Sequence, residues 1–504
     1  MTLRRRLWSP SAIVFISSAC VMTLELVASR LIAPRLGVSL YTWTSIIGVI
    51  LAGISLGNYL GGRLADRYAS STFLGLVFVL ASLGSLSILL LIQVMHAIRL
   101  PEGMPLILWV VGYIAAVFFL PSTLLGCISP IVVKLTLTDL ARSGTTVGRL
   151  YAWSSAGSIV GTFATGFWLI SWFGTKTIVI LVASLLMLLG LWFLSDTTRR
   201  GIVTRSILCL GLFGLAIGLL GWAGYLKREC ARETNYFCIK VQESTRDGRP
   251  IRELILDRLV HSYSDLQDPT HLVYGYEQTY ADVIRPLMAA KPDLSALFIG
   301  GGGYTFPRYL EARLPESRLV VAEIDPGVTT IATRLLGLSL DTRIETYNLD
   351  ARLFLMHHAE PKAYDLAFGD AFNDYSVPFH LTTLEFDRLV AGTLRDGGLY
   401  VVNIVDGGRR GHFLRAYVRT LRQVFAHVVV IPSSAAWRNS SRMTFVIVAS
   451  QEPLQLDHLS QASQPLNDEV LEEYLAMEPP LILTDDHVPV DNLLAPVFED
   501  SARG

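Results

Sequence analysis

Long apolar stretches separated by short charged loops fill the first 226 residues of the chain. Seven of these stretches have about 20 residues, the length with which an α-helix crosses a bilayer. They run over residues 11–31, 41–60, 72–95, 106–133, 150–172, 177–194 and 207–225. So many in succession are not typical of buried helices in a soluble protein. The pattern therefore predicts a multi-pass α-helical membrane domain of about seven helices.

At about Lys227 the long apolar stretches give way to shorter runs. Residues 236–243 and 253–262 are predicted to form a β-hairpin, because the turn signal Asp247-Gly248 lies between them. Further strands are expected at 296–299, 318–323, 343–348, 364–369, 398–404, 427–431 and 443–449. Helices between them would give a mostly parallel sheet covered on both faces. We predict a membrane domain at 1–226, followed at 227–504 by a small β-hairpin region and a Rossmann-like α/β domain.

Composition and charge support this division. Hydrophobic residues make up 51% of the chain and charged residues only 17%, whereas a soluble chain carries about 25% charge. Residues 1–226 have 15 Lys and Arg against 5 Asp and Glu, a net charge of +10, and residues 227–504 have a net charge of −11. These values argue against an ordinary cytosolic enzyme, a disordered chain and a disulfide-built domain.

The loops of the first half predict an orientation in the membrane. Arginines 4–6 precede the first apolar segment, and Lys and Arg gather again after the second, fourth and sixth segments. The positive-inside rule then places the N-terminus in the cytoplasm, and seven crossings would leave the second half outside. Cys230 and Cys238 follow the last segment, where an external setting would allow a disulfide. Two separate buried thiols are the alternative. A re-entrant or miscounted segment would instead leave the second half inside, so the side of the membrane stays open.

Small and kinking residues predict how the apolar segments pack. Glycines recur at four-residue spacing, which lets membrane helices approach closely. They are Gly53, Gly57 and Gly61, then Gly157 and Gly161, then Gly214 and Gly218. Pro121 and Pro130 predict a kink in the fourth segment.

The chemistry is concentrated where predicted strands end. The strand at 296–299 runs into Gly300-Gly301-Gly302, where a ligand can press against the backbone. Glu323 ends the next strand and suits the two hydroxyls of a ribose. Asp350 and Asp370 follow the third and fourth strands. A structural turn or a solvated carboxylate explains any one of these features, but together they predict a nucleoside-type ligand.

Several short motifs carry a resemblance to a known family. They are Leu256-Asp257, Glu277, Gly300-Gly301-Gly302, Glu323-Ile324-Asp325-Pro326, Asp350-Ala351, Tyr364-Asp365, Asp370 and Thr383-Leu384-Glu385-Phe386. With them, residues 253–405 resemble the spermidine synthases (polyamine aminopropyltransferases), a branch of the class I S-adenosylmethionine-dependent methyltransferase fold. The whole chain looks like the membrane-fused bacterial version of this family. The resemblance implies that Glu323 holds the ribose, that Asp350 meets the adenine amino group and that Asp370 lies beside the reacting centre.

The sequence also departs from the family pattern. The glycine loop continues as Gly303-Tyr304-Thr305, where the family has an aspartate that helps to hold an amine. Asn373 stands where the family has its proton acceptor, and Asp374 is the nearest substitute. His261 replaces a glutamine, and Tyr276 stands one position later than the family's tyrosine.

The resemblance implies transfer of an aminopropyl group from decarboxylated S-adenosylmethionine to a polyamine. We expect Asp370 and Asp374 to be catalytic. Gly300, Gly301, Gly302, Glu323, Asp350 and Asp370 are expected to bind the nucleoside co-substrate. His261, Tyr276, Glu277, Asp485 and Asp486 are expected to bind the amine. A packed structural role for His261, and a capping or surface role for Asp485 and Asp486, are the alternatives.

Two other functions remain open at this point. A methyltransferase that uses S-adenosylmethionine itself would share the nucleoside site. A sensor or transporter would bind a nucleoside or a polyamine without turnover, as the change at Asn373 would allow. We expect a small-molecule amine and the lipid bilayer as partners, no nucleic acid and no metal, and a cell-membrane location. A homodimer is left open.

Overall fold

The computed structural model describes residues 9–37, 39–96, 98, 101, 103–137, 139–194, 199–226, 229–371 and 377–503. The chain divides into two compact units, residues 1–229 and residues 230–504. Each unit is described by itself.

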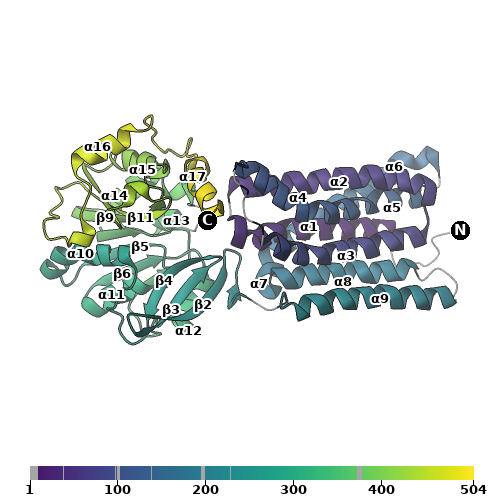
Figure 1. The fold of residues 1–504 in the computed structure, drawn as a ribbon, viewed down its shortest axis with the longest axis horizontal. Helices are drawn as coiled ribbons and strands as arrows, with labels where there is room; N and C mark the ends of the chain where they lie inside the picture. Colours follow the sequence, from purple (N-terminus) through teal and green to yellow (C-terminus); the bar gives the residue numbers. More distant parts are fainter. Residues whose placement is uncertain are drawn as a thin grey trace. The chain divides into compact units, whose positions relative to one another are not determined.

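Unit 1 is built from helices that run alongside one another (Figure 1). The α-helices are α1 (Pro10–Leu36), α2 (Leu40–Tyr68), α3 (Ser71–His96), α4 (Leu106–Gly126), α5 (Ile128–Thr136), α6 (Ser143–Ala164), α7 (Ile170–Phe173), α8 (Thr175–Leu194) and α9 (Arg199–Trp222). A short 3₁₀ helix, η1 (Leu140–Arg142), precedes α6, and a π-helical turn, η2 (Thr165–Leu169), joins α6 to α7.

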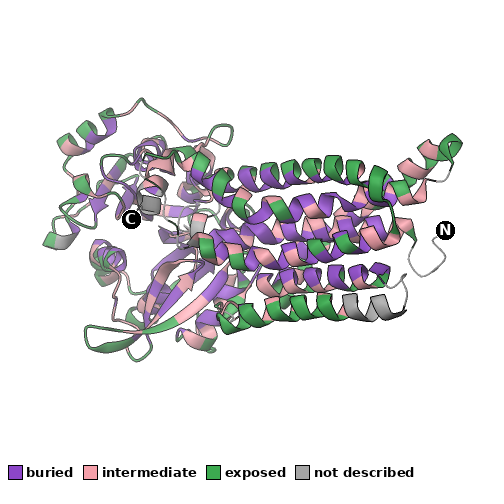
Figure 2. Cartoon of the chain, turned by 45° about the vertical axis from the view of Figure 1, so that its right-hand side comes forward, coloured by how far each residue is buried: buried purple, intermediate pink, exposed green. Residues whose placement is uncertain are grey.

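Six helical stretches in the described residues are long and apolar enough to cross a membrane. They are Pro10–Pro34, Leu40–Tyr68, Ser71–Met95, Leu106–Thr136, Leu140–Phe173 and Thr175–Leu194. The seventh predicted segment forms a shorter apolar helix, Ser206–Trp222. Large apolar side chains such as Leu108, Trp172, Leu188 and Trp222 are exposed on the outside of the unit, and Figure 2 shows the buried residues gathered inside it. An apolar exterior of this extent is consistent with contact with lipid.

The predicted glycine faces are confirmed for two of the three sets. A Cβ on Gly57 would lie 2.2 Å from the Thr123 carbonyl oxygen, and one on Gly157 would lie 2.1 Å from that of Phe15. These glycines therefore let α2 meet α4 and let α6 meet α1. The prediction is wrong for Gly214 and Gly218, which face open space on α9.

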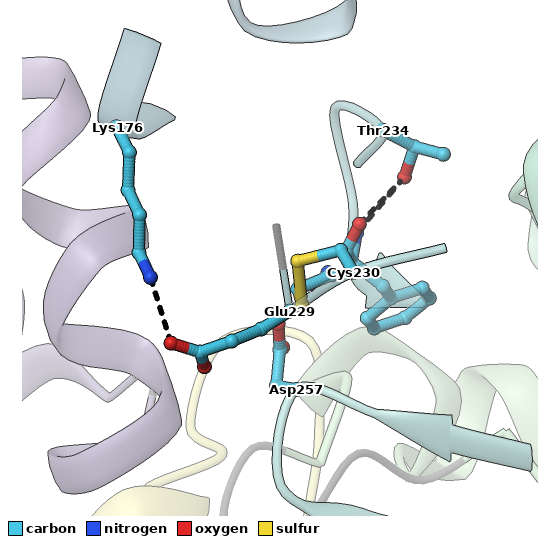
Figure 3. The surroundings of a disulfide bond; sticks show 7 residues. Lys176, Glu229, Cys230, Thr234 and Asp257 are labelled. Atoms are coloured by element: carbon cyan, nitrogen blue, oxygen red, sulfur yellow. Dashed lines mark hydrogen bonds and ion pairs between the residues drawn. A yellow bond between two sulfur atoms is a disulfide. The ribbon is translucent and has the colours of Figure 1, made fainter. Parts of the chain in front are cut away.

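The fourth predicted segment divides at Cys127 into α4 and α5, which agrees with the predicted kink. Pro121 lies inside α4, and Pro130 lies in the first turn of α5. Unit 1 ends at Glu229, whose carboxylate forms an ion pair with Lys176 Nζ (2.7 Å; Figure 3).

Unit 2 begins with a four-stranded antiparallel sheet in the order β1-β2-β3-β4. Its strands are β1 (Arg232–Glu233), β2 (Cys238–Arg246), β3 (Arg249–Leu256) and β4 (Leu259–Asp265). The predicted single strand at 253–262 is wrong, because the chain turns back at Asp257, which has a φ of 55°. A disulfide joins Cys230 to Cys238 (Figure 3), so the alternative of two separate thiols is also wrong.

The second sheet has seven strands in the order β10-β11-β9-β8-β5-β6-β7. They are β5 (Ser295–Ile299), β6 (Arg318–Ala322), β7 (Glu345–Tyr347), β8 (Tyr364–Gly369), β9 (Leu394–Asp406), β10 (His427–Pro432) and β11 (Met443–Ser450). Strands β5 to β9 pair in parallel, and β11 lies antiparallel between β9 and β10. This order, which reverses at β5 and carries one antiparallel strand near an edge, is that of the class I methyltransferase fold.

Helices cover both faces of this sheet (Figure 1). They are α10 (Gly275–Ala290), α11 (Thr305–Arg313), α12 (Pro326–Leu335), α13 (Ala351–His357), α14 (Leu384–Thr393), α15 (Phe413–Leu421), α16 (Asp468–Ala476) and α17 (Val490–Arg503). Short 3₁₀ turns are η3 (Phe379–Leu381), η4 (Trp437–Asn439) and η5 (Gln461–Ser463). Side chains of α10, α11 and α12 form one apolar core with the sheet. The carboxyl ends of β5, β6, β7 and β8 meet at one edge, where the fold positions its ligands.

Candidate active site

The glycine loop lies between the ends of β5 and β8. The Gly300 N–H donates to the Ala322 carbonyl, and Gly300 has a φ of +96°. A Cβ at this position would lie 2.4 Å from the carbonyl oxygen of Asp370. Only glycine therefore fits both the conformation and the close approach of the two loops.

Glu323 follows β6 and is held by the glycine loop. Its Oε2 accepts from the Gly301 N–H (2.8 Å), and its Oε1 accepts from the Asp325 N–H (2.9 Å). Burial raises the pKa of Glu323 to about 7, although these backbone hydrogen bonds act in the opposite direction. A fixed carboxylate at this position suits a ligand with two neighbouring hydroxyl groups.

Asp350 caps the N-terminus of α13. Its Oδ1 accepts from the backbone N–H groups of Arg352 and Leu353, and its Oδ2 lies 2.8 Å from His380 Nε2. Burial raises the pKa of Asp350, but the hydrogen bonds from His380 and from the helix backbone outweigh it, so the pKa lies below its usual value.

Asp370 follows β8 and receives two side-chain donors. Tyr276 on α10 donates from its hydroxyl to Oδ2 (2.9 Å), and Asn403 on β9 donates from Nδ2 to Oδ1 (2.8 Å). Burial nevertheless raises the pKa of Asp370. The two donors fix the direction of a carboxylate whose basicity the surroundings increase.

Several buried polar atoms of unit 2 have no hydrogen-bond partner among the described residues. They are Glu277 Oε2, Tyr280 Oη, Asn403 Oδ1, His261 Nε2 and Ser262 Oγ. Glu277 is 3% exposed, and its pKa is raised well above the usual value, first by burial and then by the charge of Asp370. Burial lowers the pKa of His261 to about 4, helped by the charge of Arg442. Such unpaired polar atoms are costly to bury without a ligand.

The departure in the glycine loop has a structural explanation. Tyr304 is fully buried in the left-handed conformation, with a φ of 57°. Its hydroxyl lies 3.1 Å from Thr329 Oγ1 and 3.3 Å from Thr346 Oγ1. The side chain is therefore packed between α12 and β7, and it provides no carboxylate for an amine.

Asp485 is connected to α13, the helix that Asp350 caps. Arg352 binds its carboxylate with both terminal nitrogens, and Thr383 Oγ1 donates to Oδ1 (2.7 Å). The hydrogen bond from Arg352 is the main reason that the pKa of Asp485 lies below its usual value. Asp486 is exposed. The predicted role of these two aspartates in amine binding stays a prediction, and the charge of Asp485 is already paired.

The structure thus brings five predicted residues together around one edge, namely Gly300, Gly301, Glu323, Asp370 and Tyr276, with Glu277 next in sequence. The predicted catalytic residue Asp374, and Asn373, lie outside the described residues. Among the residues that the structure describes, no group of three or more His, Cys, Asp or Glu side chains could hold a metal ion.

No family model matches the chain. A probable polyamine aminopropyl transferase of Bifidobacterium longum (strain NCC 2705) is 28% identical over 224 residues, 40% of this chain and 48% of that protein. A polyamine aminopropyltransferase of Corynebacterium efficiens is 25% identical over 415 residues, 78% of this chain and 76% of that protein. By sequence, the chain is similar to polyamine aminopropyltransferases.

The chain therefore spans about half the length of the first relative and about three quarters of the second. Among solved structures, a probable spermidine synthase from Corynebacterium glutamicum ATCC 13032 is 20% identical, with a TM-score of 0.44. The match covers 50% of this chain and 94% of that one.

Two residues of this candidate site were missed by sequence reasoning. Asn403 is the one amide in the apolar run Val401-Val402-Asn403-Ile404, and that contrast was a usable signal. His380 carries no such signal, because it lies in an irregular segment and reaches Asp350 only through the folding of η3.

Proposed function

We propose that the chain is a membrane-bound aminopropyltransferase that moves an aminopropyl group from decarboxylated S-adenosylmethionine to a small polyamine. The observation that carries the proposal is the buried Asp370 carboxylate at the end of β8, which is held by Tyr276 and Asn403. Glu277 accompanies it with an Oε2 that has no hydrogen-bond partner. Two buried carboxylates suit a cationic substrate that must lose one proton before it reacts.

The reaction needs a neutral amine as its nucleophile. The amine nitrogen attacks the methylene carbon beside the sulfonium, a C–N bond forms, and the C–S bond breaks. The electron pair of that bond stays on sulfur, so the leaving group is neutral methylthioadenosine. The nitrogen's surplus proton passes to a carboxylate, for which Asp370 is the candidate among the described residues. A positioned base of this kind contributes about 10²–10⁴-fold to the rate.

The other groups would orient the two substrates. Glu323 would accept the ribose hydroxyls, and Asp350 would accept the adenine amino group. Glu277 Oε2 would accept from the polyamine, which would give this buried atom the partner that it lacks. Correct orientation of two reactants can lower a barrier by roughly 7–11 kcal/mol.

Unit 1 would hold the enzyme in the membrane. Six helical stretches of suitable length and an apolar outer surface support this part of the proposal. The bilayer would then be a permanent partner of the chain, and the amine a transient one.

Product analysis by mass spectrometry tests the proposal. Detergent-purified full-length protein would be incubated with S-adenosylmethionine, its decarboxylated form, and a mixture of diamines and polyamines. We expect methylthioadenosine and an amine that is heavier by one aminopropyl group. S-adenosylhomocysteine with a methylated product would make the chain a methyltransferase. Neither by-product, with nucleoside still bound, would make it a sensor or transporter.

A further inference from the structure

The Cys230–Cys238 disulfide closes a short loop at the start of unit 2. The two cysteines are eight positions apart, and the loop between them contains β1, which pairs with β2. Cys238 is also held by Asp257, whose Oδ1 accepts from the Cys238 N–H (3.0 Å). Thr234 and Asp257 lie around this disulfide (Figure 3). The loop is therefore fixed at both of its ends.

Thr234 connects this loop to the sheet. Its side chain is buried, and its Oγ1 accepts from the backbone N–H groups of Tyr236 (3.1 Å) and Phe237 (3.0 Å). The same hydroxyl donates to Asp325 Oδ2 at 2.6 Å. The methyl group of Thr234 occupies the space beside Gly327, where a Cβ would lie 2.3 Å from it. The loop is thus packed tightly on the first turn of α12.

Asp325 links Thr234 to Glu323 through hydrogen bonds. Asp325 is 1% exposed and caps α12 by accepting from the Gly327 N–H at 2.7 Å. Its own N–H donates to Glu323 Oε1 at 2.9 Å. A continuous set of short contacts therefore runs from the disulfide loop through Thr234 and Asp325 to the carboxylate that is proposed to hold the ribose.

Tyr236 lies in the same loop and close to the same acids. Its pKa is raised first by burial and then by the charges of Asp325, Asp350 and Glu323. The charges of the carboxylates proposed to bind the nucleoside therefore act on this loop. The position of this loop therefore affects the proposed nucleoside site, although the loop lies far from Glu323 in the sequence.

We propose that Thr234, held in place by the Cys230–Cys238 disulfide, is a positioning residue for the nucleoside site, so that opening the disulfide weakens nucleoside binding. The inference rests on the nucleoside assignment made above. Reduction by tris(2-carboxyethyl)phosphine breaks the S–S bond with two electrons from phosphorus. The sulfurs become thiols with protons from water, and the phosphine becomes its oxide.

The test is calorimetric binding of methylthioadenosine to detergent-purified full-length protein, with and without this phosphine. We expect the phosphine to weaken binding to the wild type by about tenfold, the size expected when a hydrogen bond to a charged group is lost. The double variant Cys230→Ser, Cys238→Ser should bind as weakly as the reduced wild type and should not respond to the phosphine. That variant also excludes effects through the free thiols Cys20, Cys127 and Cys209.

Variants of Thr234 separate positioning from general stability. Thr234→Val should weaken methylthioadenosine binding by about tenfold, and Thr234→Ser should restore it to within about twofold. Thr330→Val is the matched control, because its hydroxyl bonds only the Pro326 carbonyl on the same helix. In the transferase assay, Thr234→Val should raise the KM for the nucleoside and leave the KM for the amine unchanged.

Hydrogen–deuterium exchange gives a readout that does not depend on activity. The amides of Asp325 and Gly327 should exchange faster after reduction of the wild type. Unchanged binding and exchange in the reduced protein would overturn this inference alone. If the oxidised wild type binds no methylthioadenosine, the proposed function fails as well. Equal weakening by Thr330→Val would also contradict a specific role for Thr234.

Discussion

At the scale of single residues, the charge of Glu323 changes near neutral pH. Its carboxyl is buried, and its pKa is raised to about 7. Because the folded protein binds the proton more tightly than the unfolded chain, Glu323 contributes least to stability above about pH 7 and more as pH falls towards the usual value of 4.5. Ligand hydroxyl groups donate to the ionised carboxylate of Glu323. The affinity for the ligand therefore rises as the pH rises through about 7.

We therefore predict that methylthioadenosine binds about tenfold more tightly at pH 8 than at pH 6, as expected for a required carboxylate with a pKa of about 7. Calorimetric titration at several pH values checks this without an amine present. In the Glu323→Gln variant, the affinity for methylthioadenosine should fall and should no longer depend on pH. Asp325 and Tyr236 also face this carboxylate, and a slope that survives in Glu323→Gln would assign the titration to other groups.

Asn403 is a second residue whose replacement should change a measurable quantity, the pH dependence of turnover. Its Nδ2 stabilises the ionised form of Asp370, whose pKa burial has already raised. Asn403→Ala should raise that pKa further, slow turnover by about tenfold or more, and move the acid limb of the pH–rate profile to higher pH. Steady-state rates over a pH series measure this shift. The exposed Asn439→Ala is the control, and an unmoved acid limb in Asn403→Ala would remove Asp370 from the role of base.

At the scale of elements, the glycine loop has two positions that differ in a useful way. Gly300 and Gly302 both have positive φ values, but only Gly300 has a backbone atom of Asp370 in the place of a Cβ. Gly302→Ala should cost about 1 kcal/mol, the strain of a left-handed residue. Gly300→Ala should cost clearly more and should also displace Asp370. Thermal unfolding and turnover of both variants check this, and equal losses would contradict the close approach.

The elements also show what the sequence could and could not predict. Glu323, Asp350 and Asp370 were found because the carboxyl ends of parallel strands meet at one edge, and alternating strands and helices reveal where those ends are. The turn at Asp257 was missed, since a non-glycine residue in the left-handed conformation leaves little trace in the sequence. The contact between Tyr276 and Asp370 joins α10 to β8 across 94 positions, and no local pattern reports it. The sequence marks Tyr304 as a departure from the family pattern, but only the fold shows its packing against Thr329 and Thr346.

At the scale of the whole molecule, the loop charges and the disulfide point to the same orientation. Lys and Arg favour the loops on the side of the N-terminus. Six candidate spans and the shorter apolar helix Ser206–Trp222 would together give seven crossings, the last near the lower limit of length for a span. Disulfides persist in oxidising compartments rather than in the cytosol.

We predict that residues 230–504 lie on the outer side of the membrane. An alkaline phosphatase reporter fused after residue 504 should be active, and the same reporter fused after α8 should be inactive. Labelling of the Cys230 and Cys238 thiols in intact cells should require prior reduction. An active reporter after α8, with an inactive one at the end of the chain, would place the transferase unit in the cytoplasm.

In the proposed reaction, the buried carboxylate of Asp370 takes the proton from the amine during aminopropyl transfer. The rate of methylthioadenosine release by wild type and by Asp370→Asn, with both substrates saturating, tests it most directly. The isosteric exposed variant Asp396→Asn on β9 is the matched control. We predict at least a 10²-fold loss in Asp370→Asn, with methylthioadenosine binding largely retained and Asp396→Asn unchanged. An Asp370→Asn protein that turns over at the wild-type rate would contradict the account.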